Sequence, residues 1–333
     1  MDALTGPGLA PLGAPPRLEP DRSAEPGGFL VAADDGTRIH FLDWDASGAP
    51  RHGPAAARVL LVPGLASTAW SWAPVARRLR AAARVVAMDL RGHGLSDAPT
   101  TGYEPGTLAR DALAVAEGAG LLPAEDAGPA GRADVPAPFV VAGIGLGAIV
   151  AAWTARALAE RCAGLVLVDG GWEDLAAATD ATPEDWLAEI GEPPEVLVSM
   201  TAWLADRAAF DPPTWDADGE RAARAQVVET AAGRVKLAIH PHALAGSVRA
   251  MWDHDPRAVL AGVTGRVAAL VARDPDGTRL AALAALATER AAAGRSPILA
   301  ASFPSRGHDL ARHEPDAVAA AVLATAARAT MPG

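Results

Sequence analysis

The chain of 333 residues is half hydrophobic, which supplies a large core and excludes a mostly disordered protein. Its 29 Lys and Arg stand against 40 Asp and Glu, giving a formal net charge of −11, and Lys236 is the single lysine. This balance argues against nucleic acid as a partner, because phosphate backbones are bound by basic surfaces. The single cysteine, Cys162, excludes an intrachain disulfide framework and an all-cysteine zinc site.

Residues 1–28 predict a disordered, proline- and glycine-rich tail. They lack the basic start and the apolar stretch of about 7–15 residues that a secretory signal needs. No segment of the chain reaches the roughly 18 uninterrupted apolar residues of a membrane span. We therefore expect a cytoplasmic protein that has no membrane partner.

Short apolar runs alternate with segments of helical spacing along the remaining chain. The runs at 29–33 and 38–44 flank a turn at 34–36 and predict a hairpin. Six further strands are predicted at 58–62, 85–88, 139–142, 165–168, 266–271 and 298–302, with helices at 72–82, 107–120, 148–160, 279–293 and 316–329. The alternation predicts an α/β fold with about eight strands in a mostly parallel sheet, helices on both faces, and the hairpin at one edge.

Residues 172–257 separate the sixth and seventh predicted strands. They show helical patterns and no convincing strand, and the insertion is far longer than an ordinary connection in an α/β fold. Ligands of open α/β sheets bind at the carboxyl ends of the strands. We therefore expect a helical cap (residues 172–257) over those ends, and a core made of residues 29–171 and 258–333.

A glycine-rich turn, GIGLG at 143–147, follows the predicted strand 139–142 and opens a helix. Small residues two positions before and two after a central residue permit the sharp strand-to-helix turn of a nucleophile elbow. The small positions here are Gly143 and Gly147, but the centre is Gly145, which has no nucleophilic side chain. Two other interpretations are a dinucleotide-binding turn with Asp169 as its acidic residue, and a purely structural turn.

Four further segments resemble the α/β-hydrolase superfamily. They are LLVPGLAS at 60–67, MDLRGHGLSD at 88–97, VLVDGG at 166–171, and SRGHDL at 305–310 with HEPDAV at 313–318. They occur in the family's order, and the resemblance extends over residues 29–330. It implies an α/β-hydrolase fold and, by family, a serine-esterase or lactonase-like chemistry.

The resemblance places the nucleophile at Gly145 and the oxyanion hole at the backbone N–H groups of Leu65 and Leu146. The sequence departs from the family at three places. Pro63 stands where the family usually has histidine, Ile144 also replaces a histidine, and Gly145 replaces the serine. Backbone donors survive side-chain replacement, so we expect the oxyanion hole to persist while the usual nucleophile is lost.

The resemblance also assigns the catalytic histidine to His308. The acid that orients it is expected after the seventh strand, at Asp274 or, less well placed, at Asp276. Asp169, at the end of the sixth strand, is a second choice. These aspartates are also common turn formers, since Asp274 and Asp276 lie beside Pro275 and a glycine.

Gly64, Ile144 and Trp172 are the predicted pocket residues, and Trp172 is chosen because it directly follows the sixth strand. Two serines near the oxyanion loop, Ser67 and Ser71, are interpreted as ordinary loop or capping hydroxyls. Three histidines of the insertion, His240, His242 and His254, suggest a metal only weakly, because the residue between the first two is proline and no clear third ligand follows. We expect no metal and no cofactor, and Cys162 is predicted to be a small buried residue.

The sequence thus predicts a protein that acts on or binds a small, largely apolar ester- or lactone-like molecule. His308, oriented by Asp274, would act as a general base on water or on a substrate proton. One alternative is an inactive homologue that binds a small ligand between cap and sheet. Another is an interaction protein that keeps only the scaffold, since a fold alone does not define a function.

Overall fold

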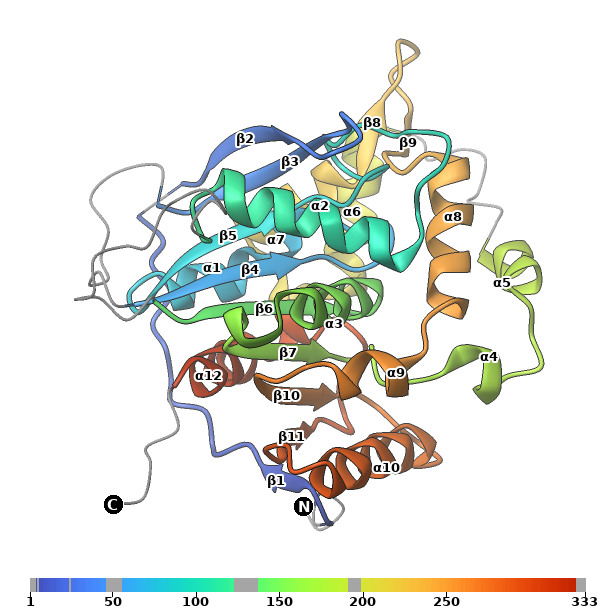
Figure 1. Ribbon diagram of the computed structural model, residues 1–333. Coiled ribbons are helices and arrows are strands. Elements are labelled where there is room, and N and C mark those ends of the chain that lie inside the picture. Colours follow the sequence, from blue (N-terminus) through green and yellow to red (C-terminus); the bar gives the residue numbers. More distant parts are fainter. Residues whose placement is uncertain are drawn as a thin grey trace.

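The computed structural model describes residues 4, 6–23, 25–45, 56–122, 137–190 and 199–327. Their main feature is a nine-stranded sheet in the order β1-β11-β10-β7-β6-β4-β5-β3-β2, in which only β3 and β2 run antiparallel to their neighbours (Figure 1). The strands are β1 (Leu9–Pro11), β2 (Gly27–Ala32), β3 (Arg38–Asp43), β4 (Ala57–Val62), β5 (Ala83–Met88), β6 (Phe139–Ile144), β7 (Gly164–Val168), β10 (Arg266–Val271) and β11 (Ile298–Ser302). The predicted α/β-hydrolase fold, with a mostly parallel sheet and an edge hairpin, is confirmed.

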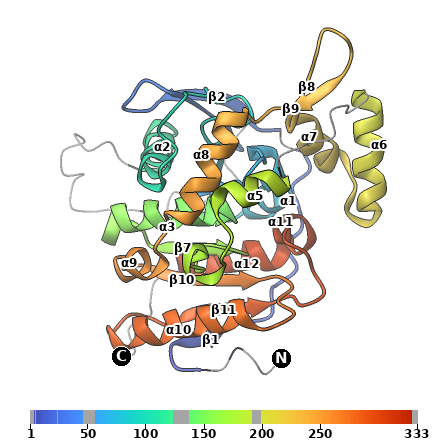
Figure 2. The ribbon, with the colours of Figure 1, turned by 90° about the vertical axis from the view of Figure 1, so that its right-hand side faces the viewer.

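Helices cover both faces of the sheet, and a separate apolar core lies under each layer (Figure 2). One layer contains α1 (Ala73–Leu79) and α12 (Pro315–Ala326), and the other contains α2 (Pro105–Gly118), α3 (Leu146–Leu158) and α10 (Thr278–Ala292). The central strands are buried along their whole length, which explains why they read as continuous apolar runs rather than alternating ones. Among the described residues, no helix is both long enough and apolar enough to cross a bilayer.

The N-terminal segment corrects the prediction of a disordered tail at 1–28. Within its described residues, β1 pairs in parallel with β11, and the Leu18 amide donates to a carboxylate oxygen of Asp316 at 3.1 Å. Spaced leucines, among them Leu9 and Leu12, pack against the two cores. Three residues of edge strand tolerate the neighbouring prolines, which is why composition alone suggested disorder.

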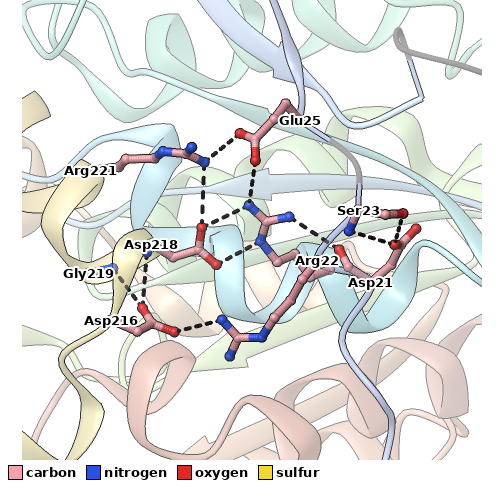
Figure 3. A network of polar contacts seen from close by, with 9 residues as sticks. Asp21, Arg22, Ser23, Glu25, Asp216, Asp218, Gly219 and Arg221 are labelled. Atoms are coloured by element: carbon pink, nitrogen blue, oxygen red, sulfur yellow. Dashed lines mark hydrogen bonds and ion pairs between the residues drawn. The ribbon is translucent and has the colours of Figure 1, made fainter.

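Ion pairs also fasten this N-terminal segment to the rest of the molecule (Figure 3). Arg22 contacts Asp216 at 3.3 Å, and Glu25 contacts Arg77 of α1 at 3.4 Å. Arg77 in turn forms a two-pronged pair with the buried carboxylate of Asp218, at 2.7 and 2.9 Å. The segment therefore joins a core helix to the insertion that follows β7.

The insertion at 172–257 lies at the carboxyl ends of the parallel strands (Figure 1). Its helices are α4 (Leu175–Ala178), α5 (Pro183–Ile190), α6 (Met200–Phe210), α7 (Ala217–Ala225) and α8 (Pro241–Trp252), and α9 (Pro256–Ala261) follows at the return to the core. The insertion also contains a two-stranded sheet, β8 (Val227–Glu229) with β9 (Val235–Leu237), so the prediction of no strand there is wrong. Two strands of three residues are too short to show a period in sequence. Parts of the predicted tail, cap and final helix, at 1–3, 5, 24, 191–198 and 328–333, lie outside the described residues.

Candidate active site

The turn between β6 and α3 has the sharp geometry expected for GIGLG. Gly145 adopts φ 55° and ψ −118°, a backbone conformation that strains any residue with a side chain. A Cβ on Gly143 would lie 2.0 Å from the carbonyl oxygen of Gly147, and one on Gly147 would lie 2.3 Å from that of Val62. These two positions admit only glycine, because the start of α3 is in direct backbone contact with the end of β6 and with the end of β4.

His308 lies directly over the centre of this turn. A Cβ built on Gly145 would lie 2.9 Å from Nε2 of His308, which is closer than side-chain atoms normally approach. The His308 side chain is 61% exposed and can shift by a few tenths of an ångström. The two sequence positions predicted to carry base and nucleophile are thus brought together, and Nε2 faces the position a side chain at 145 would take.

The acid beside His308 is Asp169, the second choice of the sequence, and not Asp274. Nδ1 of His308 lies 2.6 Å from Oδ2 of Asp169. The carboxylate of Asp274 instead accepts the amides of Arg279 at 3.3 Å and Leu280 at 2.8 Å, at the start of α10. Asp276 accepts the amide and hydroxyl of Thr278 in a local turn. Both alternatives therefore stabilise the loop into α10.

Asp169 is held from several sides. It has a positive φ of 47°, which aspartate tolerates better than most residues. Its Oδ1 accepts the amide of Ala272 at 2.9 Å and Nη1 of Arg279 at 2.6 Å. Burial alone would raise the pKa of this carboxyl, but the hydrogen bond from His308 and the charge of Arg279 outweigh it and hold the pKa below its ordinary value. Asp169 is therefore ionised at neutral pH and fixes the Nδ1–H form of His308.

Leu65 and Leu146, the predicted oxyanion-hole residues, line the same cavity as His308. Leu146 is the first residue of α3, and N–H groups of a first helical turn have no acceptor within the helix. The positive end of the helix dipole adds to their attraction for an anion. Gly64 keeps the Leu65 loop close to the elbow, since a Cβ there would lie 3.2 Å from the carbonyl oxygen of Ile144. The anion-binding role of these amides stays a prediction.

The cavity beneath the insertion has a volume of about 700 Å³. Gly64 and Ile144 line it, whereas Trp172, the third predicted pocket residue, does not. Trp172 is 1% exposed, and its Nε1 donates to the carbonyl oxygen of Arg279 at 3.2 Å. Trp186 of α5 lines the cavity instead. Most of the remaining wall is apolar and comes from Leu146, Ile149, Leu175, Ala178 and Met251.

A second cavity of about 670 Å³ adjoins the first, lies beside α1, α6 and α7, and shares four lining residues with it. These are Ser67, Ser71, Gln226 and Asp309. The hydroxyl of Ser71 donates to the carbonyl oxygen of Thr68 at 2.8 Å, in keeping with a loop role. Burial raises the pKa of Asp309, whose Oδ1 accepts the amide of Arg312.

The cysteine and the histidines of the insertion do not form a metal centre. In the described ranges, no three His, Cys, Asp or Glu side chains are arranged to hold a metal ion. His254 is buried, with Nε2 3.0 Å from the carbonyl oxygen of Gly171, and it accepts a hydrogen bond from Nε1 of Trp153. Cys162 is buried as predicted, and burial raises the pKa of its thiol to about 12.

Comparison with known families matches residues 59–321 to the model of the alpha/beta hydrolase family. A non-heme chloroperoxidase of Streptomyces lividans is 32% identical over 182 residues, which cover 54% of this chain and 56% of that protein. The chain therefore spans little more than half the length of this relative.

Solved structures are similar to a larger share of this chain. An E-2-(acetamidomethylene)succinate hydrolase superposes with a TM-score of 0.67 at 19% identity, over 90% of this chain and 99% of that one. A thioesterase domain from the curacin biosynthetic pathway superposes with a TM-score of 0.62 at 18% identity, over the same shares of the two chains. At such identities the likeness shows the fold alone.

Proposed function

This chain belongs to the alpha/beta hydrolase family, and from that premise we propose that it hydrolyses a small, largely apolar ester or lactone by direct attack of water. The observation that carries the proposal is the pairing of His308 with Asp169 at 2.6 Å, with Nε2 turned to the bare centre of the elbow. Gly145 offers no atom for an acyl-enzyme, so water takes the place of the serine hydroxyl.

The proposed reaction proceeds in two proton-coupled steps. Nε2 of His308 accepts a proton from water as the water oxygen bonds to the substrate carbonyl carbon, while Asp169 stabilises the imidazolium. The carbonyl electrons move to the oxygen, which accepts hydrogen bonds from the Leu65 and Leu146 amides. When the tetrahedral intermediate collapses, the bond to the leaving oxygen breaks and that oxygen takes the proton from His308.

The apolar wall of the 700 Å³ cavity supports an uncharged substrate of modest size. The rate is expected to be low. In a serine triad, loss of the nucleophile lowers turnover by about 10⁶, and the remaining groups keep roughly 10³–10⁴ over water. General-base assistance contributes about 10²–10⁴.

The test is a panel of short-chain esters and lactones assayed with wild type, His308→Ala and His242→Ala. His242 is an exposed histidine of the insertion and serves as the matched control. We expect turnover that disappears in His308→Ala and persists in His242→Ala, with no acyl adduct on the intact protein by mass spectrometry. Turnover that is indifferent to His308→Ala would overturn the proposal, as would an acylated wild-type protein.

Saturable quenching of the fluorescence of Trp186 by the same compounds, with no product formed, would instead favour the alternative of an inactive ligand-binding protein.

A further inference from the structure

Arg279, on the first turn of α10, bridges two carboxylates at the edge of the candidate site. Its Nη1 lies 2.6 Å from Oδ1 of Asp169, and its Nε lies 2.6 Å from Oε1 of Glu173. The guanidinium carbon lies 5.4 Å from the ring centroid of Trp172, whose Nε1 donates to the carbonyl oxygen of Arg279. The guanidinium is thus fixed by two ion pairs and an aromatic face, and it lines the cavity.

This arrangement divides the Asp169 carboxylate between two partners. Oδ2 accepts a hydrogen bond from Nδ1 of His308. Oδ1 accepts hydrogen bonds from the Arg279 guanidinium and from the amide of Ala272. A cation on Oδ1 draws negative charge away from the oxygen that faces the imidazole, so the carboxylate supports a protonated His308 less strongly. Glu173 offsets this effect, because it neutralises part of the same cation.

We propose that Arg279 is a positioning residue that fixes the Asp169 carboxylate toward His308 and, with Glu173 as its counter-ion, sets how strongly Asp169 supports the base. Its meaning for catalysis rests on the proposed function, whereas its effect on His308 can be measured without turnover. Because the guanidinium fork contacts both carboxylates at once, an ammonium group is not an equivalent replacement.

Two other charged groups, Asp309 and Arg306, lie near His308 in the chain. Asp309 adjoins His308 in the chain and lines the same cavity. Arg306, two residues before His308, is turned toward Glu314, with Nε 2.6 Å from Oε1. The charged group that contacts Oδ1 of Asp169 is the Arg279 guanidinium. A substitution of Arg279 therefore acts on His308 through Asp169.

Two substitutions are expected to act in opposite directions. Arg279→Met removes the cation and leaves Asp169 with its full charge, so the His308 titration midpoint moves up by about 0.5–1 pH unit. Glu173 loses its counter-ion in that variant, and burial, which already raises the pKa of its carboxyl, then acts on it without the opposing charge of Arg279. Glu173→Gln leaves the Arg279 charge on Asp169 alone, so the midpoint moves down. Arg279→Lys keeps a cation, so its His308 titration midpoint is expected to lie between those of wild type and Arg279→Met.

The experiment is an NMR titration of the His308 Cε1–H signal in the full chain, assigned by its loss in His308→Ala. Shifts of opposite sign in Arg279→Met and Glu173→Gln support the proposal. Equal midpoints in wild type and both folded variants overturn it, and so do shifts of the same sign. If Arg279→Met fails to fold, Arg279→Lys and Glu173→Gln decide the question by the same criterion.

The two proposals fail separately. Absence of any turnover in wild type removes the hydrolytic function but leaves the NMR result standing. Where turnover is measured, the kcat inflection is expected to follow the NMR midpoint while KM changes by less than about twofold, because two ion pairs already engage the Arg279 guanidinium.

Discussion

Nδ1 of His308 lies 2.6 Å from Oδ2 of Asp169, although 139 positions separate the two residues in the chain. The pair gives the cavity, most of whose exposed wall is apolar, a candidate base with a fixed tautomer, since a buried carboxylate holds the Nδ1 proton and leaves Nε2 as the acceptor. This contact also decides which aspartate of three candidates can influence His308.

Asp169→Asn and Asp274→Asn are a matched pair that tests this choice. Asparagine at 169 removes the charge that supports the imidazolium, and turnover is expected to fall by about 10²–10⁴. Asparagine at 274 keeps one acceptor oxygen for the amides of Arg279 and Leu280 and does not touch the His308–Asp169 pair, so turnover is expected to stay near that of wild type. Steady-state rates on one responsive ester measure both. The reverse ranking would return the acid to the loop after β10.

Gly145→Ser should restore a nucleophile to the elbow. Gly143 and Gly147 keep the sharp turn, and the introduced Cβ would displace Nε2 of His308 from 2.9 Å by only a few tenths of an ångström. A fluorophosphonate probe should label this variant, with loss of fluoride, while wild type stays unlabelled. Gly145→Ala is the control, because it adds the same crowding and strain, about 1–3 kcal/mol, without a hydroxyl.

The double variant Ile144→His with Gly145→Ser also restores the histidine that the family carries at position 144, and it is tested with the same probe. Labelling of wild type at any serine would show that another hydroxyl is the nucleophile. A folded but unlabelled double variant would show that His308 does not activate a side chain at 145.

Acidification should weaken the Asp169 contacts. The pKa of Asp169 is held below the unfolded value of about 3.9, so its stabilisation is fully present above that pH and is lost as the pH falls through the folded pKa. The difference in unfolding free energy between wild type and Asp169→Asn is therefore expected to shrink between pH 5 and pH 3. Urea unfolding at both pH values measures it. A constant difference would mean that Asp169 keeps an ordinary pKa in the folded protein.

The ion pairs of the N-terminal segment should differ in strength. Asp218→Ala leaves the buried guanidinium of Arg77 without its main partner and is expected to lower the free energy of unfolding by about 3–5 kcal/mol. Arg22→Ala breaks an exposed pair with Asp216 and should change it by about 0–1 kcal/mol. Urea denaturation of the full chain measures both. Equal effects of the two substitutions would contradict the division into buried and exposed pairs.

Periodicity predicted the sheet, the edge hairpin and the long insertion, because buried parallel strands and amphipathic helices leave strong patterns. The approach of His308 to Gly145 was implied by the family resemblance of their motifs, which follow β11 and β6, two strands with β10 and β7 between them in the sheet. The acid could not be chosen in the same way. Asp169 and Asp274 follow β7 and β10, which are adjacent in the sheet and end at the same edge, so only the direction of each side chain separates them.

Trp172 and Trp186 show a similar limit. Trp172 directly follows β7, at the edge where ligands bind, but its ring turns into the core and packs beneath Arg279. Trp186 lies on a short helix of the insertion, whose placement over the cavity depends on tertiary packing. β1 could not be predicted for a different reason, since a strand of three residues beside prolines shows no periodic pattern.

The pairing of β1 with β11 bears on the order in which the molecule assembles during translation. The Leu18 amide and the Asp316 carboxylate that it contacts are 298 positions apart, so ribosomal synthesis at about 5–20 residues per second separates them by roughly 15–60 s. Because β1 is made first, it has no partner strand until β11 emerges, and an unpaired strand is a template for association with other chains. Docking of β1 is therefore a late event that closes this edge of the sheet, and nascent chains are most exposed to misassembly just before it.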